Sequence, residues 1–152
     1  MCAILYIMDI DTLKQMIQKD LQINDAELDT ASLGIPQLHS RYLNILHDEK
    51  LILQSLRIRK RKLLKEKWEY YTGKMDSDTL REKGLEPFNL KILKQDVDMY
   101  IESDDEVVAI DSKLFLQQEK VDFLQETVKA INNMQWHIRD AIAWRKFING
   151  MN

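Results

Sequence analysis

The stretch that decides the fold is PQLHSRYLNILHDEKLILQSLRIRKRKLLKEKWEYYTG, residues 36–73. Its apolar residues recur at helical spacing as far as Tyr71, and Gly73 then ends the pattern. Because proline is accepted in the first turn of a helix, the spacing predicts one long helix over about residues 36–72, beginning near Pro36.

The second half of this predicted helix contains a dense group of cations, which we call the basic block. It consists of Arg57, Arg59, Lys60, Arg61, Lys62, Lys65 and Lys67. The net charge of the whole chain is −3, so the block polarises the surface and favours a polyanionic partner. A solvated helix face is the simpler interpretation. However, Glu66 is the only acid among these cations, and uncompensated like charges at i,i+4 spacing favour an external anion.

Aromatic residues follow the basic block directly, at Trp68, Tyr70 and Tyr71. Flat rings beside cations are typical of sites that bind single-stranded nucleic acid, because unpaired bases stack on them. No groove-reading module is visible in the sequence. We therefore predict single-strand binding by the basic block together with Trp68 and Tyr71, and packing of the aromatic rings in the core remains the alternative.

The rest of the chain favours an all-α fold, since its 152 residues include only 4 glycines and 2 prolines. Residues 11–22 have the spacing of a short amphipathic helix, and residues 24–33 do not. Two regions are expected: an N-terminal helical region with the basic helix and a connector (1–94), and a C-terminal helical region (95–152). The connector, residues 74–94, leads to a short helix at 95–102. Ser103 to Glu106 match a capping box, so a last helix is predicted from about 104 to 149.

Apolar residues of the last helix follow a near-heptad spacing typical of self-association. They are Leu114, Val121, Leu124, Val128, Ile131, Ile138 and Ile142. Phe115, Phe123, Met134 and Trp144 lie off this seam, and about three helices offer few neighbours to cover them. The surplus predicts a homo-oligomer.

Seven acids and no cation lie between Asp96 and Asp111. Acids near a helix N-terminus compensate the helix dipole. The alternative is a dock for a basic partner or for the basic block of another copy.

Other functional classes lack their signatures. The glycines make no phosphate-binding loop, the three histidines have no metal-ligand spacing, and no nucleophile motif is present, so we predict no enzyme, cofactor or metal site. No apolar run approaches a membrane span. One cysteine fits a reducing cytoplasm.

The run LLKEKWEYYTG, residues 63–73, resembles the Lys-x-Arg/Lys and Tyr-Tyr-Ser/Thr-Gly hallmark of the UvsY recombination mediators of T-even-type bacteriophages. MDIDTLKQMIQKDLQI from Met8, RYLN at 41–44 and DDEVVAID at 104–111 resemble other parts of that family, in the same order. Met8 is the family-like start, so residues 1–7 are expected to be an addition.

The resemblance implies a small all-helical protein that forms a ring through its C-terminal region. Such a protein binds single-stranded DNA and helps a UvsX-like recombinase replace the phage single-strand-binding protein in the cytoplasm of the infected host. The DNA-binding positions of the motif correspond to Lys65 and Lys67, and Glu66 stands where the family has a small residue. The rival hypothesis is a coiled-coil adaptor that binds only proteins, with its basic helix docked on the acids of a neighbour.

Overall fold

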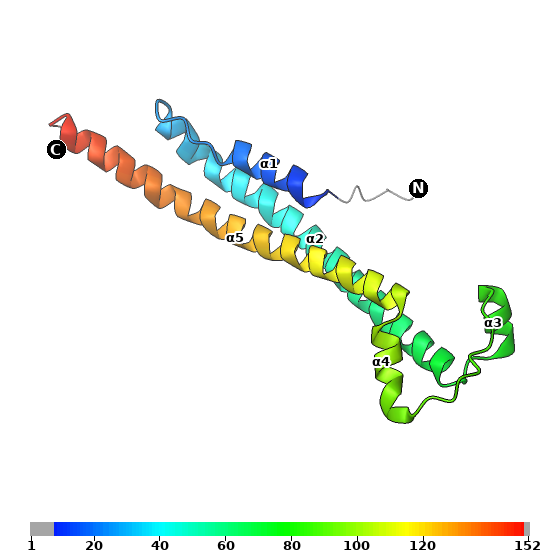
Figure 1. The fold of residues 1–152 in the computed structure, drawn as a ribbon. Helices are drawn as coiled ribbons and strands as arrows, with labels where there is room; N and C mark the ends of the chain where they lie inside the picture. The colour runs from blue at the N-terminus through cyan, green and yellow to red at the C-terminus, as the bar shows by residue number, and fades with distance from the viewer. Residues whose placement is uncertain (1–7, 151–152) are drawn as a thin grey trace. The chain divides into compact units, whose positions relative to one another are not determined.

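The computed structural model describes residues 8–150, so the prediction for residues 1–7 lies outside the described part of the chain. Between residues 8 and 150 every regular element is helical, and the predicted all-α class is confirmed (Figure 1). The elements are α1 (Ile10–Asp20), α2 (Leu28–Tyr71), α3 (Ser77–Lys83), the 3-10 turn η1 (Lys94–Asp96), α4 (Val97–Glu102) and α5 (Asp105–Ile148).

The chain divides into two compact units that do not follow the predicted regions 1–94 and 95–152. Unit 1 contains the residues up to Glu49 and those from Lys120 onward, and unit 2 contains Lys50–Glu119. Each unit therefore takes a part of α2 and a part of α5. The assignment of DNA binding and self-association to separate halves of the sequence stays a prediction.

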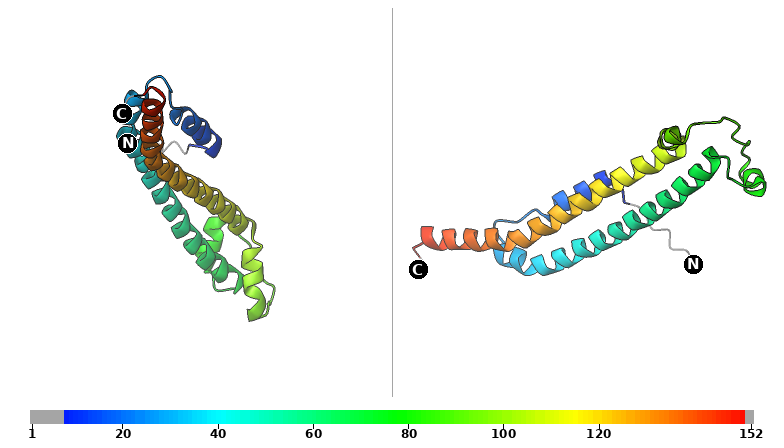
Figure 2. Two further views of the ribbon diagram at one scale, coloured as in Figure 1. Left: turned by 90° about the vertical axis from the view of Figure 1, so that its left-hand side faces the viewer. Right: turned by 90° about the horizontal axis from the view of Figure 1, so that it is seen from below.

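In unit 1, α1 lies beside an antiparallel pair formed by α2 and α5 (Figure 1 and Figure 2). Arg145 of α5 pairs with Asp25 just before α2, and Lys120 of α5 pairs with Glu49 of α2 at 3.2 Å. The core contains Leu13, Ile17, Leu28, Ile35, Tyr42, Leu46, Val121, Leu124, Val128, Ile131 and Ile138. Burial of this apolar surface is the main term that stabilises the unit.

In unit 2, the second half of α2 packs against α4 and the start of α5. Val97, Ile101 and Val107 form a buried cluster. Leu63, Leu64, Tyr71 and Ile92 pack against that cluster. The basic block is thus attached to a small apolar core. This core determines which side chains of the basic block face α5.

The predicted start of α2 near Pro36 is wrong, because the helix begins at Leu28. Proline inside a helix removes one hydrogen bond to the carbonyl four residues earlier, here Ser32. Both residues are exposed, so water can satisfy that carbonyl. Leu28, Ile35 and Tyr42 are buried at seven-residue intervals and hold this turn in place. Helices were predicted from apolar residues that recur every three or four positions. A single buried residue in every seven does not produce that pattern.

The predicted capping box at Ser103 is also wrong. The Ser103 hydroxyl donates instead to the carbonyls of Met99 and Tyr100, at the end of α4. Asp104 is the residue that caps α5, since its Oδ1 accepts from the Glu106 amide at 3.0 Å. The Glu106 side chain is therefore free to reach α2.

Candidate nucleic-acid interface

The most buried cation of the basic block is Lys67, although the family resemblance assigns it to DNA. Its Nζ lies 3.0 Å from Glu106 Oε1 and 3.1 Å from Asp104 Oδ1, and its side chain is 10% exposed. Burial lowers the pKa of Lys67, but its hydrogen bonds and proximity to Glu106 and Asp104 outweigh burial and raise the pKa overall. Lys67 is held charged inside the protein, where two carboxylates already occupy its ammonium group.

Tyr71 belongs to the same internal network. Its hydroxyl donates to Asp104 Oδ2 at 2.8 Å. Burial, and then the bond to Asp104, raises the pKa of Tyr71 to about 12. Burial alone would raise the pKa of Asp104, whereas the bonds from Tyr71 and Lys67 lower it overall. The predicted DNA contact by Tyr71 therefore competes with a structural role.

Two other cations of the basic block also have partners on α5. Lys60 Nζ is 2.7 Å from Asp111 Oδ1, and Arg57 donates to Gln118 Oε1 at 2.9 Å. We call Arg57, Lys60 and Lys67 the paired cations. The acidic run from Asp96 to Asp111 thus pairs with the basic block of the same chain, an arrangement that differs from the dock for a neighbouring copy considered above.

The remaining cations of the basic block have exposed side chains. Arg59, Arg61 and Lys62 are exposed and form no ion pair with any residue between 8 and 150. We call these three the unpaired cations. Lys65 is 77% exposed and lies 3.6 Å from Glu69 in the same helix, a contact of little energetic weight at that exposure. These four side chains can neutralise phosphates without breaking a buried contact.

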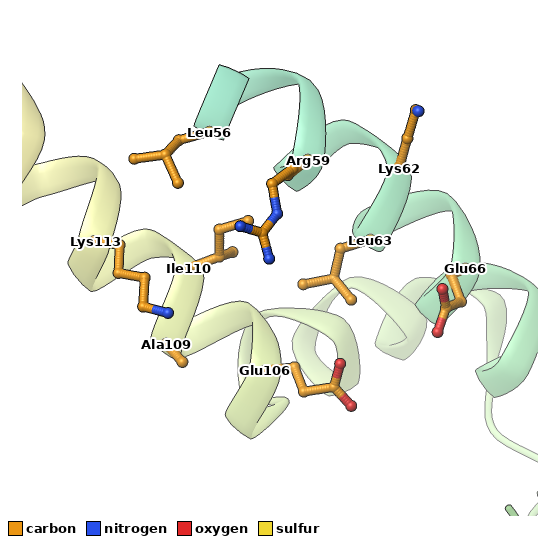
Figure 3. Close-up of a pocket in the computed structure, with 9 residues that line it drawn as sticks. All are labelled: Leu56, Arg59, Lys62, Leu63, Glu66, Glu106, Ala109, Ile110 and Lys113. Atoms are coloured by element: carbon orange, nitrogen blue, oxygen red, sulfur yellow. The ribbon is translucent and has the colours of Figure 1, made fainter. Parts of the chain in front are cut away.

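A groove of about 410 Å³ runs beside two of the unpaired cations (Figure 3). It is lined by Leu56, Arg59, Lys62, Leu63, Glu66, Glu106, Ala109, Ile110 and Lys113. Arg59 extends from α2 toward Ile110 and Lys113 on α5, whereas Lys62 points away from α5 (Figure 3). Sequence reasoning missed Lys113, because only the pairing of the two helices brings it near Arg59.

Glu66 carries the negative charge that the motif of this chain places among the cations. The structure neutralises it with a residue outside the motif. Lys83 of α3 places its Nζ 2.6 Å from Glu66 Oε1. Glu66 therefore adds less repulsion toward a polyanion than the sequence suggests.

Trp68 is the most accessible aromatic residue at this end of α2, with 41% of its surface exposed. Tyr70 and Tyr71 pack instead in a cluster with Phe88 and Tyr100, with ring centres 5.0 to 6.0 Å apart. Trp68 is therefore accessible for the predicted base stacking, whereas Tyr70 and Tyr71 pack within the protein.

The arrangement suits binding of an anion, because its exposed charged side chains are mostly cations. No group of three or more metal-binding side chains occurs among the described residues. The same part of the chain has no helix long and apolar enough to cross a bilayer. The region combines exposed positive charge with one accessible indole ring. This combination is typical of proteins that bind single-stranded nucleic acid.

Comparison with known structures shows the fold to be shared. Three crystal structures of the recombination mediator protein UvsY from bacteriophage T4 align with this chain. Lattice type II matches with a TM-score of 0.81 and 22% identity, covering 93% of this chain and 98% of that one. Lattice type IV gives 0.81 and 22%, covering 92% and 99%, and lattice type I gives 0.78 and 23%, covering 89% and 97%.

No curated protein sequence matches the chain. Residues 16–151 match the family described as recombination, repair and ssDNA binding protein UvsY. The match covers most of the chain, and it agrees with the motif at residues 63–73 and with the shared fold. The chain therefore belongs to the UvsY family of recombination, repair and single-stranded-DNA-binding proteins.

Proposed function

We propose that this protein is a recombination mediator acting in the cytoplasm of the infected bacterial host. It binds single-stranded DNA and helps a UvsX-like recombinase to replace the phage single-strand-binding protein. The proposed role is non-catalytic and needs no cofactor. The observation that supports it is the set of unpaired cations, which stand with Lys65 and Trp68 on exposed parts of α2.

Single-strand binding follows from this exposed charge. Each phosphate neutralised by a lysine or arginine releases a counterion, so affinity falls as salt rises. Fluorescence anisotropy with a labelled oligonucleotide, single-stranded and then duplex, tests the proposal across a salt series. Tighter binding of the single strand with a steep salt dependence is expected. Binding indifferent to salt would contradict phosphate contact by several cations.

The loading step needs a separate measurement. Recombinase activity is followed on DNA already coated with the single-strand-binding protein, with and without this chain. We expect a shorter lag in recombinase ATP hydrolysis when the chain is present. If the lag is unchanged while DNA binding is intact, the protein binds single-stranded DNA but is not a mediator.

Self-association into a ring-like homo-oligomer is the second part of the proposal. Repeated weak sites act at high effective concentration, so avidity can exceed single-site affinity by about 10²–10⁴. The predicted oligomerisation seam is mostly buried within the chain: Val121, Leu124, Val128, Ile131 and Ile138 are core residues, and Leu114 and Ile142 are half-buried. We therefore place the contact between copies on the exposed apolar end of α5, where Trp144, Phe147 and Ile148 are 62%, 73% and 62% exposed.

Light scattering tests this assignment. The variant Trp144→Ser/Phe147→Ser is expected to have a smaller mass in solution and an unchanged helical content. The matched control, Leu33→Ser/Leu51→Ser, replaces apolar residues that are 81% and 70% exposed on α2. Equal masses for both variants and the parent chain would reject the end of α5 as the contact.

The adaptor that binds only proteins is the competing function. Its supporting feature was a basic helix available for the acids of a neighbour. Lys60 and Lys67 already contact Asp111, Asp104 and Glu106 of their own chain, which weakens that argument. Failure to bind oligonucleotides in dilute buffer would favour the adaptor.

A further inference from the structure

A second cleft opens at the C-terminal end of α2, beyond the basic block. Gly73 ends the helix with φ +67°, a conformation that favours glycine, and the chain then turns back so that Lys74 lies beside Trp68. The cleft measures about 870 Å³, large enough for a nucleotide. Its lining residues are Trp68, Tyr71, Thr72, Gly73, Lys74, Phe88, Asn89, Leu90, Lys91, Ile92, Lys94, Val97 and Asp98.

The charge of this cleft is positive. Lys74, Lys91 and Lys94 line it against one acid, Asp98. All three lysines are exposed, and none forms an ion pair within residues 8–150. Lys91 and Lys94 come from the connector that precedes α4, a segment that the sequence analysis did not connect with binding.

Trp68 is the wall of the cleft best suited to a planar ligand. Tyr71 and Phe88 pack edge to face at 5.0 Å. Trp68 lies outside that cluster and is 41% exposed. Lys74 Nζ lies 4.2 Å from the centre of the Trp68 ring, which shows that a face of the indole is accessible to a polar group.

The same indole connects the cleft with the basic block. Trp68 also lines a smaller cleft of about 390 Å³ together with Lys65. A strand that contacts Lys65 therefore reaches Trp68 within one turn of α2. The two clefts share Trp68 and Asp98.

We propose that the larger cleft holds an unpaired base of the bound strand, stacked on Trp68, with Lys91 and Lys94 contacting the neighbouring phosphates. Lys74 leaves the ring to make room and contributes a third cation. This inference rests on the proposed single-strand binding and adds a base-holding site to it. Duplex DNA does not satisfy the site, because its bases are already stacked.

Tryptophan fluorescence with a strand that lacks bases tests the stacking. The chain has three tryptophans, and Trp136→Phe/Trp144→Phe leaves Trp68 as the only reporter. The probes are a labelled oligothymidine and an abasic strand of the same length. We expect the oligothymidine to quench Trp68, and the abasic strand to bind, by anisotropy, without quenching it. Equal quenching by both strands, or binding of oligothymidine with no quenching, would overturn the proposal.

The tryptophan variant has its own control. The mass of this variant by light scattering and its helical content must equal those of the parent chain. If they differ, the oligothymidine affinities of the parent chain and of its Trp68→Leu variant are compared by anisotropy. Loss of the stacked base is then expected to weaken the binding of oligothymidine about 5- to 150-fold. An affinity equal to the parent's would reject the site. If neither strand binds any form of the protein, the proposed function itself has failed, and that outcome is distinct from the others.

The lysines are tested apart from the ring. Lys91→Gln/Lys94→Gln is expected to lower the slope of log affinity against log salt by about 1.4, since each phosphate contact on a single strand contributes about 0.7. The matched control, Lys19→Gln/Lys146→Gln, removes two exposed lysines of unit 1. Equal slopes for the two variants would remove Lys91 and Lys94 from the site.

Discussion

The paired and unpaired cations occupy the same eleven-residue segment of α2, residues 57–67, yet they differ in what surrounds them. Lys67 is enclosed by Asp104 and Glu106, whereas Arg59, Arg61 and Lys62 are exposed and form no ion pair among the described residues. The chemistry of the side chains is the same in both sets. The difference teaches that a basic run can have two functions at once: some members fasten the helix to α5, and the others remain available to a polyanion.

This comparison also changes how the family motif is read in this chain. The resemblance assigned DNA contact to Lys65 and Lys67 alike. Lys65 is 77% exposed, and the side chain of Lys67 is 10% exposed. Reversing the charges of Lys65 and Lys67 together would therefore mix a surface effect with the disruption of a buried network. Separate substitutions are required.

The largest effect is expected from Lys67→Met. This change leaves Asp104, whose side chain is 10% exposed, without its cation, and breaking a buried pair in this way costs about 3 kcal/mol. Urea unfolding followed by circular dichroism measures the loss. Lys65→Met is the matched control and should change the free energy of unfolding by less than about 0.5 kcal/mol. Equal losses for the two variants would contradict the structural role assigned to Lys67.

The second effect concerns DNA affinity. Arg59→Gln/Arg61→Gln/Lys62→Gln should weaken single-strand binding about 10- to 100-fold at low salt and reduce the salt slope by about 2. Stability should stay the same or rise slightly, because the like charges of Arg61 and its i,i+4 neighbours are relieved.

Anisotropy titrations measure the change, with Lys19→Gln/Lys129→Gln/Lys146→Gln as the control of equal charge. If the control weakens binding as much as the test variant, the effect comes from net charge and has no local origin.

The third effect is a pH dependence of stability that arises from the network of Lys67, Tyr71 and Asp104. The pKa of Tyr71 is raised to about 12 in the folded protein, so its contribution to stability is complete below about pH 10 and is lost as pH rises through about 12. The pKa of Lys67 is also raised, so the contribution of Lys67 is likewise lost at alkaline pH. The pKa of Asp104 is lowered, so its contribution is present above pH 3.8 and is lost as pH falls below that value. Urea midpoints at pH 7 and pH 11 measure the alkaline loss. A Tyr71→Phe variant should lose less between these two pH values, and an identical loss would contradict the assignment.

The smallest effect should come from Asp111→Asn, which converts a paired cation into an unpaired one. Lys60 and Asp111 are 34% and 44% exposed, so breaking their contact should cost less than about 1 kcal/mol. The released Lys60 should increase the salt slope of DNA binding by about 0.7. Glu119→Gln removes the same charge without releasing Lys60 and serves as the control. Identical slopes would mean that Lys60 stays out of reach of the strand.

Much of the fold was predictable because helical periodicity is local. The final helix, predicted over about residues 104 to 149, spans Asp105–Ile148. The start of α2 was not predictable from the same spacing. Leu28 and Ile35 are buried in the core of unit 1, and one residue in seven identifies a helix only when its packing partner is known.

The candidate site was predicted at the level of composition and not at the level of individual residues. On a helical wheel that begins at Leu56, Lys60 and Lys67 lie within about 40° of that half-buried leucine, and this direction was the available signal of their burial. Nothing in the local sequence indicates Lys113, Lys91 or Lys94. Their relevance depends on segments that come together only when the chain folds.

By itself, the sequence determined that the protein is all-α, that its cations concentrate at one point beside aromatic residues, and that it resembles the UvsY family. These properties depend on residues that are near one another in the sequence, because periodicity, local charge and the order of motifs can all be determined from the linear chain. Only the tertiary structure decided which cations are available, that the heptad seam of α5 is largely internal, and that Trp68 faces a cleft with three lysines. Burial and ion pairing depend on distances across the fold, and a linear pattern does not contain those distances.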